Sequence, residues 1–128
     1  MRVLLDTHAF LWWVTDDRRL SATARRVIAD MDHRIYLSAA SAWEIATKQR
    51  IGKLDGVPDA ARRYTELAAA DGFEHLPITH LHALRAGGFT VAHRDPVARM
   101  LAAQSELERM PLLTRDPAFE LFGIETRW

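Results

Sequence analysis

The chain has 128 residues, of which 48% are hydrophobic, and its 17 basic residues balance its 17 acidic residues. This length predicts one compact domain over residues 1–128, and the hydrophobic content is typical of a chain that folds around a core. The absence of cysteine excludes disulfides and thiolate-bound zinc, and the zero formal charge argues against a non-specific polyanion binder.

The elements predicted in the first half of the chain alternate between short apolar runs and longer amphipathic segments. In chain order they are a strand over 2–5, a helix over 7–14 capped by Thr7, a helix over 22–31 capped by Ser21, a strand over 34–38, a helix over 39–54 that stops near Gly52, and a helix from Pro58 to Ala70. The segment 22–31 has one apolar face, which consists of Ala24, Val27, Ile28 and Met31. We expect this face to be buried.

The second half of the chain continues the alternation. It comprises a strand over 73–78, a helix from 79 to the glycine pair at 87–88, a helix from a cap at Asp95 to about residue 108, a strand over 111–114, a short helix over 118–122 and a strand over 124–128. Strands that alternate with helices are typical of α/β proteins, in which a mainly parallel sheet is covered on both faces. In such sheets the ligand crevice lies at the carboxyl ends of the strands.

The apolar N-terminal stretch does not predict a signal peptide or a membrane segment. Asp6 and His8 interrupt it, and no stretch of the sequence reaches the roughly 18 uninterrupted apolar residues that a membrane span needs. We therefore expect a cytoplasmic protein without membrane association.

Two acids stand close behind predicted strands. Asp6 directly follows the run 2–5, and Asp116 comes shortly after the strand 111–114. Both are therefore expected at the carboxyl edge of the sheet, where a charge is costly unless it is paired or binds a metal. The alternative is that each of them is an ordinary helix cap or turn residue.

Two further acids belong to predicted helices. Glu44 lies between Trp43 and Ile45 in an otherwise apolar segment, so we expect it to face partly inward, with a solvated helix residue as the alternative. Asp95 precedes Pro96 and has the position of a helix cap, and it is also a candidate carboxylate of a metal site. The edge of a parallel sheet is a place where these distant carboxylates can converge.

The segments around these acids resemble the motifs of one family along essentially the whole chain. "LLDTHAFLWW", "SAASAWEIATKQRIGKL", "HRDP" with "RMLAAQ" shortly after it, and "LLTRD" occur in this order. They resemble the motifs of PIN-domain ribonucleases and, within these, of the VapC toxins of bacterial toxin–antitoxin pairs. The resemblance implies a three-layer α/β/α fold, an acidic pocket that holds Mg²⁺ or Mn²⁺, and hydrolysis of phosphodiester bonds in RNA.

The resemblance also assigns roles to individual residues. It places the family's acids on Asp6, Glu44 and Asp116, with Thr114 as the hydroxyl residue before the last acid. The motif that commonly reads HRDPFDR in this subgroup reads HRDPVAR here, so Ala98 stands where the family usually has a further acid of the metal site. We therefore expect an endoribonuclease that is weakened at position 98.

Hard divalent cations suit such a site because they prefer carboxylate oxygens while keeping several waters. Asp6 and Asp116 are the predicted metal ligands. Glu44 is predicted to hold a metal-bound water or to orient the nucleophile. Asp95 is an additional candidate ligand at the rim of the pocket, and capping of the helix alone is its alternative role.

Hydroxyl and guanidinium groups surround the acidic motifs. Thr7 and Thr114 are predicted to hydrogen-bond the carboxylates, and their alternatives are a helix cap and a plain strand-end hydroxyl. Arg94, Arg99 and Arg115 are predicted to contact RNA phosphates, and plain surface arginines are the alternative.

Two functions from different classes remain open. The first is a metal-dependent endoribonuclease toxin, which the resemblance implies is a homodimer held inactive by a cognate antitoxin that brings a basic group, commonly an arginine, into the acidic pocket. The second is a catalytically impaired protein of the same fold, which binds antitoxin or RNA without efficient cleavage because of Ala98. A receiver or phosphatase domain is disfavoured, because Thr7 and His8 stand where it would need a second acid.

Overall fold

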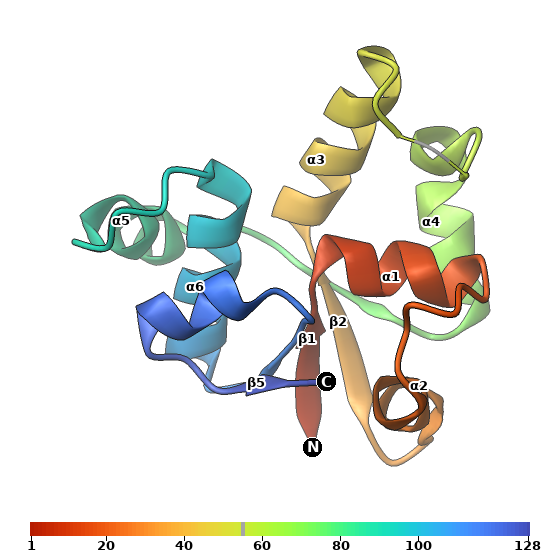
Figure 1. Ribbon diagram of the computed structural model, residues 1–128, viewed down its shortest axis with the longest axis horizontal. Helices are drawn as coiled ribbons and strands as arrows, with labels where there is room; N and C mark the ends of the chain where they lie inside the picture. The colour runs from red at the N-terminus through yellow and green to blue at the C-terminus, as the bar shows by residue number, and fades with distance from the viewer. Residues whose placement is uncertain (55) are drawn as a thin grey trace.

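The computed structural model describes residues 1–54 and 56–128, which form a parallel sheet between layers of helices (Figure 1). The sheet contains five strands of the described chain in the order β3-β2-β1-β4-β5, and every neighbouring pair is parallel. The strands are β1 (Arg2–Leu5), β2 (Arg34–Ser38), β3 (Glu74–Leu76), β4 (Leu112–Leu113) and β5 (Thr126–Arg127). The predicted parallel sheet is confirmed, although β3, β4 and β5 are shorter than the sequence predicts.

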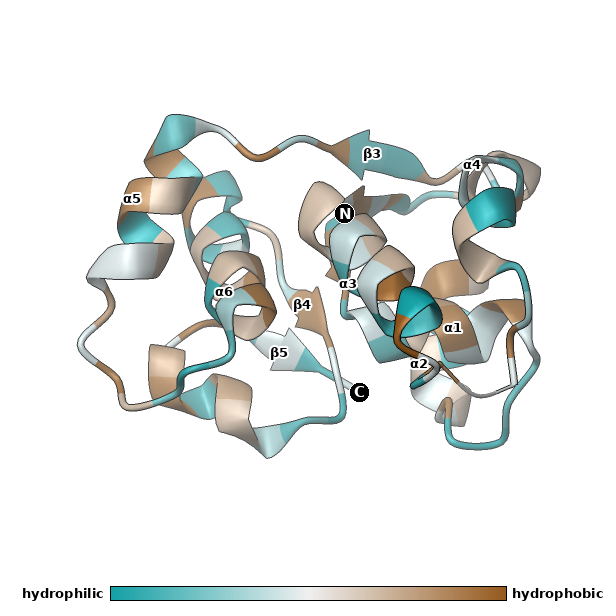
Figure 2. Cartoon of the chain, turned by 90° about the horizontal axis from the view of Figure 1, so that it is seen from above, coloured by the Kyte–Doolittle hydropathy of each residue, from teal (hydrophilic) through white to brown (hydrophobic). Residues whose placement is uncertain are grey.

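The helices lie on both sides of this sheet, as the view from above shows (Figure 2). They are α1 (Thr7–Val14), α2 (Ala22–Ala29), α3 (Ala39–Arg50), α4 (Ala60–Ala70), α5 (His80–Gly88), α6 (Pro96–Glu108) and the 3₁₀-helix η1 (Pro117–Phe122). In the described ranges, none of these helices is long and apolar enough to cross a membrane.

Strand β1 contributes to an apolar core on each face of the sheet. Val3 and Leu5 pack into one cluster with residues of α1, α2 and α4, whereas Leu4 packs into the other with residues of α5, α6 and η1. Successive side chains of a strand point to opposite faces, so one short apolar run supplies both cores. The three-layer α/β/α architecture implied by the sequence motifs is therefore confirmed.

Several helix ends differ from the sequence prediction for local reasons. Asp6, and not Thr7, is the N-cap residue of α1, and Thr7 is the first helical residue. Helix α2 ends at Ala29, so Met31 lies beyond it and is 96% exposed, and the prediction that Met31 is buried is wrong. Helix α4 begins only after Asp59, whose left-handed backbone (φ 63°) breaks the helical geometry.

The chain between α5 and α6 is held by the side chain of Arg99. Its guanidinium donates hydrogen bonds to carbonyl oxygens, at 2.8 Å from Nε to Ala86 and 2.9 Å from Nη1 to His93. The same guanidinium also reaches the carbonyl oxygens of Gly87, Phe89 and Val91. Arg99 therefore fixes the path of the loop that leads to Asp95, and this structural role competes with the predicted contact to RNA.

We expect Arg99→Ala to lower the free energy of unfolding by about 2–3 kcal/mol, because the carbonyl groups of the loop lose their charged donor. Arg99→Lys should lose nearly as much, since an ammonium group cannot reproduce the planar fork of donors. Arg94 is exposed in the same loop, and Arg94→Ala is the matched control that should stay within about 0.5 kcal/mol of the parent. Urea denaturation measures these differences, and equal stabilities of the two alanine variants would contradict the role given to Arg99.

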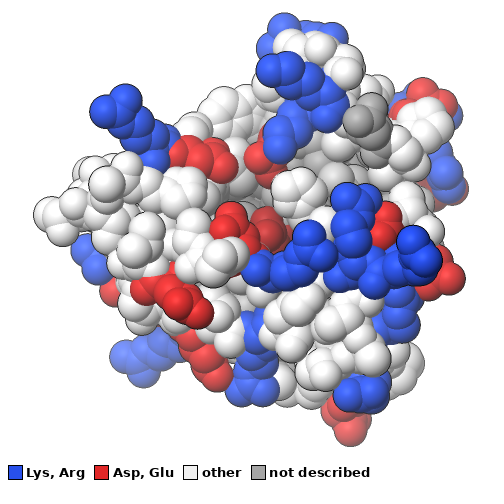
Figure 3. All heavy atoms as spheres, in the orientation of Figure 1, with Lys and Arg blue, Asp and Glu red and all other residues white. Residues whose placement is uncertain are grey.

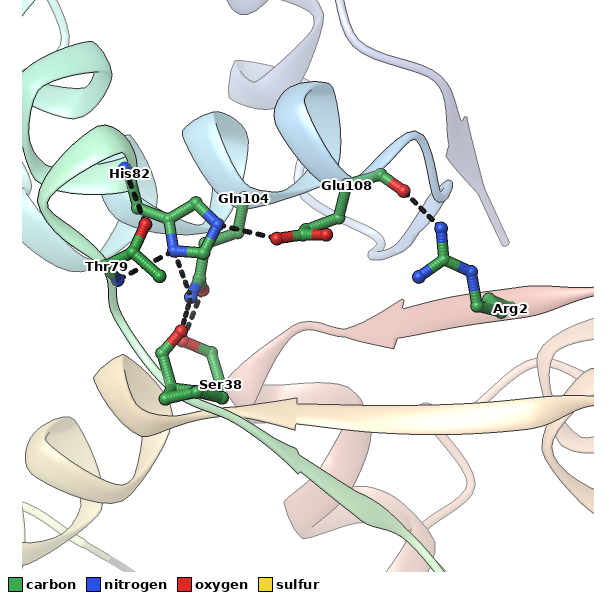
Figure 4. Close-up of polar contacts among 7 residues, drawn as sticks. Arg2, Ser38, Thr79, His82, Gln104 and Glu108 are labelled. Carbon is green, nitrogen blue, oxygen red and sulfur yellow. Dashed lines mark hydrogen bonds and ion pairs between the residues drawn. The ribbon is translucent and has the colours of Figure 1, made fainter.

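A buried polar network joins α5 and α6 to the end of β2 (Figure 4). His82 is almost fully buried, with its Nε2 3.0 Å from Oε1 of Glu108. Its Nδ1 accepts a hydrogen bond from the main-chain N–H of Thr79 at 3.0 Å, so in the neutral ring the proton lies on Nε2 and points to Glu108. Ser38 donates a further hydrogen bond to Oε1 of Gln104. The network fixes α6 against the sheet with its polar groups paired.

Candidate functional site

The four acids singled out in the sequence line one cleft at the carboxyl edge of the sheet. The cleft has a volume of about 90 Å³, and its walls include Asp6, Glu44, Asp95 and Asp116. Figure 3 shows acidic side chains gathered near the centre of this face, with Lys and Arg side chains above them and to their right. The structure therefore brings together carboxylates that come from four separate segments of the chain.

The hydroxyl of Thr114 joins the carboxylate of Asp6 to the main chain of Asp116. Asp6 directly follows β1 and is buried, and its main-chain N–H donates to the carbonyl oxygen of Leu113 in β4 at 3.0 Å. Thr114 Oγ1 donates to Oδ2 of Asp6 at 2.7 Å and accepts from the main-chain N–H of Asp116 at 3.1 Å. Strands β1 and β4 are neighbours, so the pairing of the sheet itself sets the spacing between these acids.

Burial raises the pKa of the Asp6 carboxyl above its ordinary value, because the charged form loses its hydration. The hydrogen bond from Thr114 and the charge of His8 lower this pKa in part, whereas the charge of Glu44 raises it. A cation bound beside Asp6 would favour its ionised form. The electrostatics of the cleft therefore suit a positively charged ligand.

The hydroxyl of Thr7 has a different partner from that of Thr114. Thr7 Oγ1 donates to Oγ of Ser41 at 2.8 Å, and both residues are buried between α1 and α3. The side chain of Thr7 thus takes a hydroxyl as its acceptor, and not a carboxylate as the sequence predicted. Its main-chain N–H lies near the Asp6 carboxyl and lowers the pKa of that group.

Asp95 and Asp116 cap helices while they line the cleft. Oδ1 of Asp95 accepts from the main-chain N–H of Val97 at 3.0 Å, at the start of α6. Oδ1 of Asp116 accepts from the main-chain N–H of Ala118 at 2.9 Å, at the start of η1. A carboxylate has two oxygens, so capping by one oxygen is compatible with a ligand role for the other.

Glu44 faces partly inward, as the sequence predicts, with 14% of its side chain exposed. Nζ of Lys48, one turn later on α3, lies 3.2 Å from Oε2 of Glu44. Among the described residues, Lys48 is the one Lys or Arg that lines the cleft, and His8 lines it as well. Sequence reasoning missed both residues, although the spacing of Lys48 and Glu44 already placed them on one helix face.

Ala98 belongs to the apolar side of the cleft. It is 6% exposed, and it lines the cleft with Val97, Leu101 and Phe119. A carboxylate at this position would share the cleft with Asp6. Both departures from the motif, Val97 and Ala98, therefore fall inside the candidate site.

The donor set fits a hydrated Mg²⁺ or Mn²⁺ ion better than an ion enclosed by protein. Within residues 1–54 and 56–128, no group of three or more His, Asp or Glu side chains is placed to hold an ion together. Mg²⁺ usually keeps several waters and takes one or two carboxylates from the protein. Asp6 and Asp116, which both line the cleft, are the carboxylates available for this role.

The arginines predicted to contact RNA lie in different surroundings. Arg115 is exposed and lines a cavity of about 380 Å³ next to the cleft, with its guanidinium 5.0 Å from the ring centroid of Trp12. Arg94 is exposed on the loop before α6. Arg99 is engaged by the carbonyl groups of that loop. Contact with RNA stays a prediction for all of them, and the position of Arg115 supports it most directly.

Several solved structures resemble this fold over almost the whole chain. A chain of VapBC2 from Rickettsia felis, solved bound to a DNA fragment from its promoter, has a TM-score of 0.64 at 12% identity and covers 99% of this chain and 98% of its own. A chain of FitAcB from Neisseria gonorrhoeae has a TM-score of 0.63 at 18% identity and covers 97% of this chain and 95% of its own. At these identities the similarity concerns the fold alone.

Sequence comparison gives the family. Ribonuclease VapC16 of Mycobacterium tuberculosis is 38% identical over 68 residues, which are 50% of this chain and 48% of that protein. The chain thus aligns with about half the length of this curated relative. The model of the PIN domain family matches residues 3–124, which include all four acids of the cleft. The chain therefore belongs to the PIN domain family.

Proposed function

We propose that this chain is the toxin of a type II toxin–antitoxin pair and hydrolyses phosphodiester bonds in RNA with the help of Mg²⁺ or Mn²⁺. The proposal is carried by the acids Asp6 and Asp116, which line one cleft at the carboxyl edge of a PIN-domain sheet. The Thr114 hydroxyl joins the Asp6 carboxylate to the main-chain N–H of Asp116. The M. tuberculosis relative is named a ribonuclease, which supports the reaction class. The whole chain acts as a single PIN domain in this proposal.

Asp6 and Asp116 are the proposed metal ligands, with Asp95 as a further ligand at the rim. A divalent ion held there supplies positive charge for the phosphoryl oxygens and lowers the pKa of a nearby water. Thr114 keeps the Asp6 carboxylate in one orientation through the 2.7 Å hydrogen bond between its Oγ1 and Oδ2. Burial of Asp6 keeps bulk water away from this ligand.

Glu44 is the proposed group that orients the attacking water and takes its proton. Its carboxylate lines the cleft, and Lys48 balances its charge at 3.2 Å. As the water oxygen bonds to phosphorus, its proton passes to Glu44 and the bond from phosphorus to the leaving oxygen breaks. The leaving oxygen then takes a proton from solvent.

A second candidate function is binding without efficient cleavage. Ala98 favours this candidate, because it places a methyl group in the wall of the cleft where the family motif has an acid. Such a protein would still engage an antitoxin or RNA through the same face. The two candidates differ in catalytic rate and share the fold.

The proposed partners are a cognate antitoxin and a second copy of the chain. The acidic cleft attracts a basic side chain, so an antitoxin arginine can inhibit the site by the same electrostatics that favour a metal ion. Leu81 and Leu84 of α5 are 59% and 70% exposed, and this apolar face supports a homodimer.

The test is cleavage of a fluorescein-labelled RNA pool in the presence of Mn²⁺ or Mg²⁺, with Asp6→Ala as the blank. We expect slow cleavage by the parent chain, and loss of cleavage both with EDTA and in the Asp6→Ala variant. Cleavage that persists in the Asp6→Ala variant would refute the proposed site. Binding of the RNA without any cleavage would favour the second candidate.

A further inference from the structure

Lys48 stands between two cavities of the structure. It lines the acidic cleft, and it also lines a cavity of about 270 Å³ between α1 and α3, whose walls include Leu11, Ile45 and Val57. Its side chain is 39% exposed. The flexible stem of a lysine therefore allows the ammonium group to lie in either cavity through a rotation of the side chain alone.

In the structure this ammonium group is the ion-pair partner of Glu44. Nζ of Lys48 lies 3.2 Å from Oε2 of Glu44, whose side chain is 14% exposed and whose charge is therefore poorly hydrated. The other acids of the cleft have different partners. Asp6 accepts a hydrogen bond from a hydroxyl, and Asp95 and Asp116 accept from main-chain N–H groups at the starts of α6 and η1. Lys48 is thus the side chain that balances the charge of Glu44.

The cation at this place is a lysine in a chain that otherwise favours arginine. The 17 basic residues include only two lysines, Lys48 and Lys53. A guanidinium group is a planar fork that binds a carboxylate at two points, as Arg34 and Arg85 do with both oxygens of a glutamate. An ammonium group is a compact charge without this fork. The contact of Lys48 with Glu44 is therefore easier to exchange than an arginine contact.

We propose that Lys48 is a built-in counter-ion of the acidic cleft, which leaves Glu44 when a divalent metal ion binds, and this inference rests on the proposed metal-dependent function. The ammonium group is repelled by a divalent ion held at Asp6 and Asp116, because like charges at short distance are unfavourable. Lys48 then turns into the cavity between α1 and α3. Its departure frees the Glu44 carboxylate, which can hold a water in the proposed reaction.

The counter-ion has opposite effects on the two states of the cleft. In the metal-free protein it reduces the repulsion among the acids, and burial together with the charge of Glu44 already raises the pKa of Asp6. In the metal-bound protein the contact with Glu44 is lost and the ammonium group lies near a second cation. Lys48 therefore stabilises the metal-free protein and weakens the binding of the ion.

The first test is the affinity of the full chain for Mn²⁺, measured from the electron paramagnetic resonance signal of free aqueous Mn²⁺ at about 0.15 M salt. Lys48→Gln removes the charge, and Lys48→Arg keeps it. Lys53→Gln removes the same charge from an exposed residue that does not line the cleft among its described residues, so it is the matched control.

We expect Lys48→Gln to bind Mn²⁺ about tenfold more tightly than the parent, because the competing charge is gone. Lys48→Arg should bind the ion no more tightly than the parent, and Lys53→Gln should stay within about twofold of it. In EDTA, Lys48→Gln should have a lower Tm than Lys53→Gln. Addition of Mn²⁺ should raise the Tm of Lys48→Gln by more than that of the parent.

The second test follows the displacement itself. Reductive methylation with ¹³C-formaldehyde labels both lysines and keeps their charges, and the signal that is missing in Lys48→Gln assigns Lys48. Titration with Mg²⁺, which is diamagnetic, should shift the signal of Lys48 in step with binding and leave that of Lys53 in place. A lysine that only supports its own helix would show no such shift.

The inference would be overturned by equal Mn²⁺ affinities of Lys48→Gln and Lys53→Gln, by a Lys48 signal that stays unmoved while Mg²⁺ binds, or by a lack of Mn²⁺ binding in all variants. None of these measurements uses RNA. Tighter binding by Lys48→Gln without cleavage by any variant would support the counter-ion and refute the nuclease proposal. Cleavage by the parent with equal affinities would refute the counter-ion and leave the nuclease proposal standing.

Discussion

Ala98→Asp should increase metal-dependent cleavage of RNA by about 10- to 100-fold, the range typical of a group that orients metal-bound water. Ala98 is 6% exposed and lines the cleft together with Asp6 and Asp116. A carboxylate at position 98 adds a negative charge that attracts the ion and an acceptor for its waters. The rate of cleavage of a labelled RNA in Mn²⁺ measures the gain.

Ala98→Asn is the matched control, because it adds nearly the same volume without the charge. The Asn variant should stay close to the parent in rate, while both variants lose some stability from the added volume at a buried position. The Asp variant should recover part of this stability when Mn²⁺ is added. Full activity of the parent with no gain in Ala98→Asp would show that position 98 lies outside the catalytic site.

Asp6→Asn should reduce RNA cleavage by at least about 100-fold while it stabilises the metal-free protein at neutral pH. The amide keeps an acceptor for the Thr114 hydroxyl but removes a charge that burial disfavours. The pKa of Asp6 is raised in the folded state above its ordinary value of 3.8. The stability contributed by its protonation is present below the unfolded pKa and is lost as the pH rises through the folded pKa.

The stability difference between Asp6→Asn and the parent should therefore be largest at neutral pH and should shrink as the pH falls toward the unfolded pKa. Thermal melts in EDTA between about pH 4 and about pH 8 measure it. Asp32 is exposed, and Asp32→Asn is the control that should show no such trend. Addition of Mn²⁺ should raise the Tm of the parent and of Asp32→Asn, but not that of Asp6→Asn. A destabilised Asp6→Asn at neutral pH would mean that burial does not dominate the energetics of this acid.

The sequence predicted the placement of the acids well because strand ends are local features. Asp6 directly follows a short apolar run, and Asp116 stands near the end of another run. Parallel strands bring their carboxyl ends to one edge, so the convergence follows from topology. Glu44 could be placed as well, since helix periodicity turns it toward the apolar face.

The hydrogen-bond partners of individual side chains were much harder to predict. The guanidinium of Arg99 folds back onto loop carbonyls, and the hydroxyl of Thr7 selects Ser41 on another helix. Neither partner follows from periodicity, because each depends on how distant segments pack. The prediction for Met31 was wrong for a local reason. Helix α2 ends at Ala29, whereas the apolar pattern of the sequence continues past that end.

The hydrogen bond from Thr114 to Asp6 joins residues that lie 108 positions apart in the chain. A ribosome therefore produces Asp6 and Glu44 long before it produces the strand that completes the cleft between them. Pairing of such distant strands is also a slow step in folding. A nascent chain that has not yet been extended past Asp116 carries most of the acids but no assembled site. The proposed nuclease can therefore cleave RNA only after the segment that contains Thr114 and Asp116 has been synthesised and paired with β1.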